Sequence, residues 1–586
     1  MRKSFGVAVL VTAACGVMVP EALAVTVSSL EVTQAIQTPT NSIKLIARRS
    51  TAVRATLATG GGAVAGVNGS LHVIRDGVDV TPAGIAPINA PMTAPAAPQR
   101  TNESDTLNFE LTGATATTVL APSSNVVFRV DVTPGPGSGS TAPLTFVDAP
   151  TPSVFFTRIN YTPGGLGLPP LSFIGPGPGD AFLRGIVPVN DNDPNLYREG
   201  LFPSLTFSED PNSNGVLDAL SSEGNDLLSL LSSCRQLIVD RGLGAAATTY
   251  LYGWVAGAVG SNGLSTVPGV VAFGNSELNR GQRSFAHEFT HLLGQNHNTR
   301  TLDQVGWDVG SRLPGNPATN NVTGRVKPMT LNDVQTAGLL TNQAWVDTLT
   351  YGAELVNPGI GLGPDASPDA LKRRIRRDQL VVQGFFDPSG KKLTSLKPVF
   401  RYPWRSEATI PNRRGPFAVR ARSERGTLVT VPFDTRVGND AGAERRGFFE
   451  VIVPLSGQVS SIAITNRSGR QTFKTLQRPK LAPSIRIVTP KPGARLGAKT
   501  RVTWTVKAGS VAVPRLRYQA AYSPDNGRTF VPIGVDLRKT SLTFDSTAIQ
   551  RSSKRGLIRI FVSDGLNTAY DDVDELSAAR GKVRHR

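Results

Sequence analysis

Short runs in which hydrophobic and polar residues alternate fill the chain between residues 25 and 150. Residues 51–57 (TAVRATL) and 126–132 (VVFRVDV) show this pattern, and Gly, Pro and Asn residues separate the runs. A period of two residues between such turns is typical of antiparallel strands with one face in water. We therefore predict an all-β sandwich domain over residues 25–150, in which His72 is a structural or surface residue of a strand.

The pattern changes after this first domain, because hydrophobic residues now recur at helical spacing between strands. Leucines at this spacing predict a helix over residues 223–240, capped by the serines just before it. Hydrophobic runs predict strands over residues 248–255 and 269–273. This mixture of elements predicts an α/β domain over residues 151–357.

Alternation with a period of two returns in the last third of the chain. It predicts two further β-sandwich domains, over residues 379–482 and 483–578. A Gly- and Pro-rich linker with a run of basic residues, 358–378, separates them from the α/β domain, and residues 579–586 form a basic tail. The sequence 522–530 resembles a hairpin of bacterial immunoglobulin or fibronectin type III modules, so we expect the β-domains to be immunoglobulin-like sandwiches.

The amino-terminal segment has the pattern of a secretory signal. Two basic residues precede an apolar run over residues 5–19, and small residues end at Ala24. We expect residues 1–24 to be removed and the mature protein to be secreted, since no later run reaches the roughly 18 apolar residues of a transmembrane segment. A lipid anchor at Cys15 is the alternative, but Thr12 fits that signal poorly.

Charge is divided unevenly along the chain. Residues 371–586 carry a net charge of +26, whereas residues 1–370 carry −8. Such a division bears on partners more than on fold. It predicts salt-dependent binding of the basic part to acidic glycans, phosphorylated polymers or another anionic surface, and nucleic acid is not expected as a specific partner.

The strongest chemical signal is the sequence HEFTHLLGQNH, which begins at His287. On a helix, His287 and His291 lie on one face and direct two ring nitrogens to one point. Gly294 allows a sharp turn after the helix, so that His297 can return as a third ligand. Three imidazoles that leave a fourth position open are typical of catalytic zinc, and Glu288 is placed to act as the general base.

This motif resembles that of the metzincin zinc metalloproteases, in which a turn with a methionine follows the long zinc motif. Met329, after Pro328, is the single methionine downstream of residues 287–297. The resemblance implies an α/β catalytic domain with Met329 as a floor beneath the imidazoles. It also implies that the strand before the active-site helix, at residues 267–274, borders the cleft and pairs with extended substrate.

Two details extend or limit this resemblance. Residues 341–351 have helical spacing, and Trp345 and Leu349 are expected to pack beneath the methionine turn. Some metzincins have a tyrosine two residues after the methionine that reaches the metal. Here that position is Leu331, so no such ligand is expected.

A second candidate metal site is the sequence DPNSNGVLD. Asp210, Asn212, Asn214 and Asp218 occupy the oxygen-ligand positions of an EF-hand-type calcium loop, with glycine at its sixth position. The twelfth position is Ser221, where a bidentate glutamate is expected. The alternative is a polar turn that caps the following helix.

These observations predict a secreted zinc endopeptidase with protein or peptide substrates, Zn²⁺ as its cofactor and Ca²⁺ as a second candidate ion. The alternative function is a surface-binding or glycan-binding protein, similar to an adhesin, that uses residues 371–586. A zinc hydrolase that acts on something other than peptides also remains open, because the motif builds only the metal centre.

Overall fold

The computed structural model of this chain describes residues 25–578 with several gaps. Outside the described residues lie 1–24, 136, 211–212, 220–221, 241–242, 246–247, 258, 261, 267, 311–323, 357–373, 376–378, 388, 403–407, 410–414, 438–446, 456, 498–499, 528–529, 545–554 and 579–586. The expected signal sequence with Cys15, most of the expected linker with its basic run, and the basic tail are therefore not described.

The described chain folds into two compact units. The first unit contains the described residues up to Glu31, residues 53–110 and residues 125–144. The second unit contains residues 32–52, residues 111–124 and the chain from Thr145 onward. Two segments that lie within the first third of the sequence thus belong to the second unit.

The first unit is built of β-strands. β4 (Val64–Arg75) pairs antiparallel with β8 (Ser123–Thr133) and with two short strands, β5 (Val78–Asp79) and β6 (Met92–Ala94). Buried and more exposed positions alternate along β8, which confirms the predicted strand pattern. A second sheet has the order β1-β3-β7, with bounds Thr26–Thr33, Thr51–Ala58 and Thr106–Leu111.

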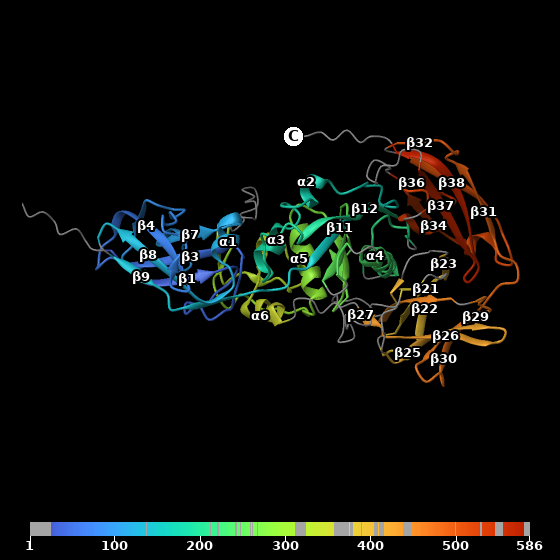
Figure 1. Cartoon of the computed structure of the whole chain (residues 1–586), viewed down its shortest axis with the longest axis horizontal. Helices are drawn as coiled ribbons and strands as arrows, with labels where there is room; N and C mark the ends of the chain where they lie inside the picture. The colour runs from blue at the N-terminus through green and yellow to red at the C-terminus, as the bar shows by residue number, and fades with distance from the viewer. Residues whose placement is uncertain are drawn as a thin grey trace, which may run out of the picture. The chain divides into compact units, whose positions relative to one another are not determined.

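The second unit is organised around a ten-stranded sheet in the order β14-β15-β13-β11-β12-β35-β34-β37-β38-β32. Figure 1 labels β11, β12, β34, β37, β38 and β32 among these strands. β15, β13, β11 and β12 are parallel neighbours, whereas β14 is antiparallel to β15. Every residue of β13 is buried, as expected for a parallel strand that is covered on both faces. These five strands are β11 (Ser153–Tyr161), β12 (Tyr197–Phe207), β13 (Thr249–Val255), β14 (Gly263–Ser265) and β15 (Val271–Asn275).

Two helices cover opposite faces of this sheet: α4 (Ser222–Asp240) and α5 (Gly281–Leu292). The ring of Tyr252 on β13 lies 4.5 Å from that of Phe285 on α5, centroid to centroid. A Cβ on the next residue, Gly253, would lie 3.0 Å from Leu231 of α4. Successive strand residues point to opposite faces, so the sheet lies between the two helices. The helix expected over residues 223–240 is confirmed.

The strand expected to border the cleft is not the edge strand. Residues 267–274 correspond to β15, which lies between β14 and β13. Among the described strands the edge is β14, because the chain turns back after Ser265 and places this three-residue strand outside β15. A strand this short leaves no periodic signal in the sequence.

The helix expected over residues 341–351 is confirmed only at the two ends of the segment. A 3₁₀ helix over Thr341–Gln343 and the start of α6 (Thr348–Val356) flank a short strand, β19 (Ala344–Trp345). The tryptophan is fully buried, and its indole Nε1 donates to the carbonyl oxygen of Ala35 at 2.8 Å. This tertiary contact holds the segment extended. Leu349, expected to be buried, is 65% exposed.

The chain beyond residue 379 forms further β-sheets, as its alternation predicts. In one region, two sheets share a core of buried Val, Ile, Leu and Phe side chains. They contain β21 (Gln379–Phe386) and β28 (Gly447–Pro454), and β25 (Phe417–Ser423), β26 (Gly426–Phe433), β29 (Ser461–Asn466) and β30 (Thr472–Gln477).

The last region is joined to the central sheet. β35 (Val531–Leu537) pairs with β12 at Thr206 and Gly534. The sheet continues with β34 (Arg517–Ser523), β37 (Gly556–Ser563), β38 (Thr568–Ala578) and β32 (Arg495–Leu496). Arg538 adds an ion pair to Glu209 at 2.9 Å. The edge of the parallel strands at β12 is therefore covered.

The described chain is mostly β-structure, distributed over many sheets. None of its described helices combines the length and the apolar character that crossing a membrane requires.

Candidate metal centre

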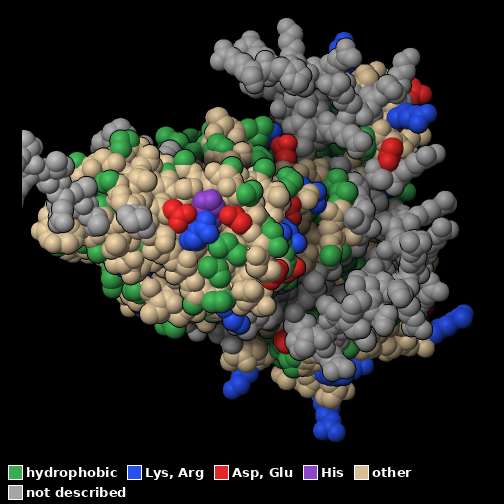
Figure 2. Space-filling model, turned by 60° about the vertical axis from the view of Figure 1, so that its left-hand side comes forward, with side chains coloured by type: hydrophobic (Ala, Val, Ile, Leu, Met, Phe, Trp, Pro, Cys, Tyr) green, Lys and Arg blue, Asp and Glu red, His purple; other side chains and the backbone are tan. Residues whose placement is uncertain are grey.

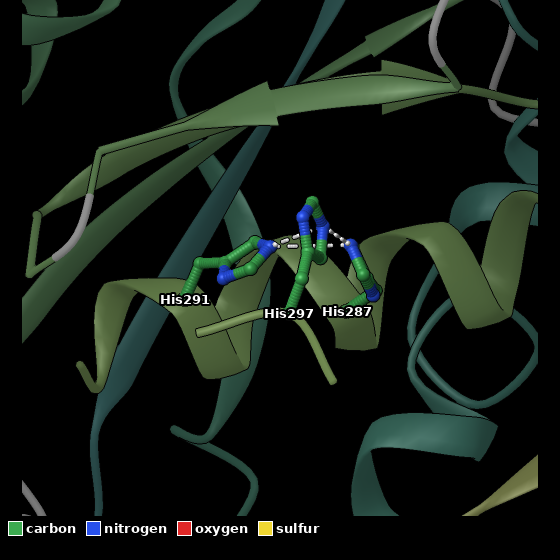
Figure 3. A group of neighbouring side chains, drawn as sticks. All are labelled: His287, His291 and His297. Carbon is green, nitrogen blue, oxygen red and sulfur yellow. Dashed lines mark hydrogen bonds between the residues drawn. The ribbon is translucent and has the colours of Figure 1, made fainter. Parts of the chain in front are cut away.

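The histidine motif lies on α5 and on the turn that follows. His287 and His291 are one helical turn apart, so their rings lie on the same side of the helix. After the helix, Gly294 has a φ of +96°, and its N–H donates to the carbonyl of His291 at 2.9 Å. This left-handed conformation favours glycine. The chain reverses there and brings His297 back beside the helix (Figure 3).

The three imidazoles converge on one point through their Nε2 atoms (Figure 3). The Nε2 atom of His287 lies 3.0 Å from that of His297 and 3.1 Å from that of His291. The Nε2 atoms of His291 and His297 are also 3.1 Å apart. The structure thus brings together all three histidines that the sequence predicts as ligands.

The opposite ring nitrogens fix the tautomers of two of these histidines. Nδ1 of His287 lies 2.8 Å from the carbonyl oxygen of Val334, and Nδ1 of His291 lies 2.6 Å from that of Gln295. A carbonyl oxygen only accepts hydrogen bonds, so each Nδ1 carries the ring proton. In the neutral rings, each Nε2 therefore directs a lone pair toward the centre of the cluster.

Burial keeps these two rings neutral. Desolvation, followed by the neighbouring His291 and Arg283, holds the pKa of His287 well below its usual value of 6.5. Desolvation also lowers the pKa of His291 to about 3, although the hydrogen bond to Gln295 opposes the shift. Neutral imidazole is the form that binds a metal, so both histidines are ready to bind at neutral pH.

This donor set fits zinc. Zn–N distances of about 2.0–2.1 Å place the ligand atoms of a tetrahedral site about 3.4 Å apart, a few tenths of an ångström beyond the separations of the three Nε2 atoms. Lone pairs that face one another in a buried cluster repel, and a shared cation relieves that repulsion. Among the described residues, this is the one group of three His, Cys, Asp or Glu side chains whose ligand atoms lie within 4.8 Å of one another.

Glu288, the expected general base, is buried next to this cluster. Its side chain is 1% exposed. Ser265 of β14 donates a hydrogen bond from its Oγ to Oε2 of Glu288 at 2.6 Å. The carboxyl group therefore has a defined position between α5 and the edge strand.

The segment after the methionine turn supports the cluster, which the sequence did not reveal. Gln335 donates from Nε2 to the carbonyl oxygen of His287 at 3.0 Å and also to the hydroxyl of Thr290. Arg283, buried one turn before His287, donates to the carbonyl of Val334 at 2.8 Å. The position of Arg283, four residues before a ligand on the same helix face, is a signal that could have identified it.

Met329 does not have the position expected of it. The turn itself is present, because the N–H of Leu331 donates to the carbonyl of Pro328 at 3.0 Å. Met329 is, however, 44% exposed, which does not suit a buried floor beneath the imidazoles. The contacts to His287 come instead from Val334 and Gln335.

The calcium-like loop forms a polar turn where it is described. Asp210 accepts hydrogen bonds from the N–H groups of Asn214 and Gly215, both at 3.2 Å. The N–H of Asp218 donates to Oε2 of Glu223, in the first turn of α4, at 3.0 Å. Asn212 and Ser221 lie outside the described residues. The alternative of a turn that caps the next helix accounts for these bonds, and calcium binding stays a prediction.

Comparisons with known proteins identify no related family for this chain. No family model matches the chain, and no curated protein matches it. Among solved structures, the comparison returns a member of glycosyl hydrolase family 2 from Bacteroides cellulosilyticus, with 10% identity, 96% of this chain and 79% of that chain covered, and a TM-score of 0.12. A likeness at this TM-score supports no inference about fold or function.

Proposed function

We propose that this chain is a secreted zinc-dependent endopeptidase of the metzincin type. The observation that carries the proposal is the convergence of three Nε2 atoms within 3.1 Å of one another, beside the buried carboxyl group of Glu288. The parallel strands with α5 on one face and an antiparallel edge strand, β14, also support it.

The residues of the site divide into ligands and a base. His287, His291 and His297 would hold the zinc ion, which supplies a Lewis acid and lowers the pKa of water when bound. Glu288 accepts the proton of the water that attacks the scissile carbonyl and then donates it to the departing amine. The hydrogen bonds from Nδ1 of His287 and His291 to carbonyl oxygens keep both rings oriented during the cycle.

Binding of an anionic polymer by the basic carboxyl-terminal region is a second candidate property. Several basic side chains on the sheet of β25, β26, β29 and β30 and on its turns are exposed: Arg422, Arg425, Arg467, Arg470 and Lys474. Figure 2 shows several Lys and Arg side chains that protrude singly from the drawn face. We regard this binding as an addition to proteolysis.

The test uses purified protein over residues 25–586, with Glu288→Ala as the matched variant. Zinc content and hydrolysis of casein or gelatin are measured with and without a chelator. We expect about one zinc ion per chain in both proteins, and chelator-sensitive cleavage in the wild type alone. Full activity in Glu288→Ala overturns the role of Glu288, whereas zinc without cleavage of any protein overturns the peptidase.

A further inference from the structure

The edge strand β14 directs two of its three residues at the active-site helix. Gly263 and Ser265 are two apart and so lie on the same face of the strand. Both are buried, and both approach Glu288 on α5. The residue between them, Leu264, points to the other face.

Gly263 allows the backbone of β14 to approach Glu288 closely. A Cβ at this position would lie 2.7 Å from Oε1 and 2.8 Å from Cγ of Glu288. Real side chains do not tolerate such distances, so a larger residue displaces the carboxyl group or the strand. The backbone of β14 therefore packs directly against the expected general base.

Ser265 adds a hydrogen bond to the packing of β14 against Glu288. Its Oγ lies 2.6 Å from Oε2 of Glu288, and the two side chains are 2% and 1% exposed. An O–H···O distance in this range is typical of a hydroxyl that donates to an ionised carboxylate. In a buried position such a bond is stronger than in water, because solvent does not compete for it.

We propose that Ser265 is a positioning residue that holds the carboxylate of Glu288 in the orientation needed for proton transfer, and that Gly263 provides the space for this contact. The inference rests on the proposed function, since it assigns a role within the same site. Ser265 acts through Glu288 and does not itself touch the reacting atoms. Without the Ser265 hydrogen bond the carboxylate loses one of the contacts that fix its orientation, and the loss of alignment lowers kcat while substrate binding is retained.

The test compares Ser265→Ala and Ser265→Thr in full-length mature protein, with Thr266→Val as the control. Thr266 is the neighbouring buried residue, and its hydroxyl makes no hydrogen bond to Glu288. We expect Ser265→Ala to lower kcat by about 10- to 100-fold, with KM within about twofold and zinc content unchanged. Ser265→Thr, which keeps the hydroxyl, restores most of the activity, and Thr266→Val behaves as the wild type.

A double-mutant cycle separates positioning from general damage to the fold. If Ser265 acts only through Glu288, Ser265→Ala lowers the residual kcat of Glu288→Gln no further. Wild-type kcat in Ser265→Ala, or an equal loss in both backgrounds, overturns the inference while the proposed function stands. Full activity in Glu288→Gln, or a wild type that cleaves no peptide, overturns the proposed function and this inference together. Melting temperatures of all variants show whether each one folds.

Discussion

The histidine cluster of the second unit and His72 of the first unit use the same side chain in opposite ways. Nδ1 of His72 lies 2.9 Å from a carboxylate oxygen of Asp79, and its Nε2 lies 3.7 Å from one of Asp131 and 3.3 Å from the hydroxyl of Ser70. Acidic and hydroxyl groups thus surround this ring. The rings of His287 and His291 have backbone carbonyls at Nδ1, and Arg283 also lies 3.3 Å from Nδ1 of His287. At Nε2 the two rings face each other and His297.

The difference shows what makes a histidine a candidate ligand. A ring beside carboxylates has partners on both nitrogens and needs no ion. In the α5 cluster, carbonyl oxygens accept the Nδ1 protons, and the Nε2 lone pairs converge in a buried space. These lone pairs repel one another, and a bound cation removes the repulsion. The arrangement of hydrogen-bond acceptors around a histidine therefore carries more information than its burial.

The largest expected effect is on zinc affinity, when one histidine in each of the two sites is replaced by alanine. His291→Ala removes a ligand, and we expect zinc affinity to fall by more than about 100-fold. This loss exceeds the roughly 10- to 100-fold loss that follows when only a hydrogen bond to a ligand is removed. His72→Ala should leave zinc affinity and peptide cleavage unchanged. Competition with a chromogenic chelator measures the affinity. Equal zinc affinity in His291→Ala and the wild type contradicts the distinction drawn here.

A pH dependence of the metal-free protein follows from the lowered pKa values. Folding favours the neutral rings of His287 and His291, because their folded pKa values lie below the usual 6.5. This stability is present above about pH 6.5 and is lost as the pH falls below it. We expect the free energy of unfolding to fall by roughly 2–3 kcal/mol between pH 7 and pH 4 from His291 alone.

Denaturant unfolding of chelator-treated protein at several pH values measures this loss. In His291→Gln, which has no ring to protonate, the decrease should be smaller by a similar amount. An identical decrease in His291→Gln and the wild type would show that burial does not depress the pKa of His291 as the structure indicates.

A supporting residue should have an intermediate effect. Gln335→Leu keeps a side chain of similar size but removes the hydrogen bonds to the carbonyl of His287 and to Thr290. We expect a 10- to 100-fold loss of zinc affinity or activity, because removing a group that orients a metal ligand typically lowers affinity or activity by about this factor. If Gln335→Leu binds zinc and cleaves peptides as well as the wild type, the post-methionine segment does not orient α5.

The smallest effect is expected at the carboxylate-bound histidine. The side chains of His72 and Asp79 are 14% and 30% exposed, and ion pairs near the surface contribute about 0–1 kcal/mol. His72→Gln should therefore lower the free energy of unfolding of the first unit by less than about 1 kcal/mol. Thermal unfolding followed by calorimetry checks this, and a larger loss would mark the His72 contacts as a structural centre.

The ligands were predictable because their geometry is local. Ring spacing on a helix and a glycine turn, both features of residues 287–297, are enough to direct His287, His291 and His297 toward one another. The strands and the helix α4 were predictable for a similar reason, since each has a hydrophobic period that follows from its own burial.

The rest of the site depends on segments that are distant in sequence. Gln335 reaches the backbone of His287 across 48 residues, and Ser265 reaches Glu288 across 23. A serine in a three-residue strand or a glutamine in a loop has no local pattern that distinguishes it. Packing also interrupts the helix expected over residues 341–351, because the buried indole of Trp345 donates to the carbonyl oxygen of the distant residue Ala35.

That acceptor, the carbonyl oxygen of Ala35, has a consequence for how the chain folds. It also accepts the backbone N–H of Trp307 at 2.7 Å, and its partner Trp345 is 310 residues away. Closing a loop of this length is entropically costly and slow compared with forming local contacts. The carbonyl of Ala35 therefore acquires its Trp345 partner only after more than half of the chain has been synthesised, whereas Arg49 of the same segment bonds to residues 184–189, which are synthesised much earlier.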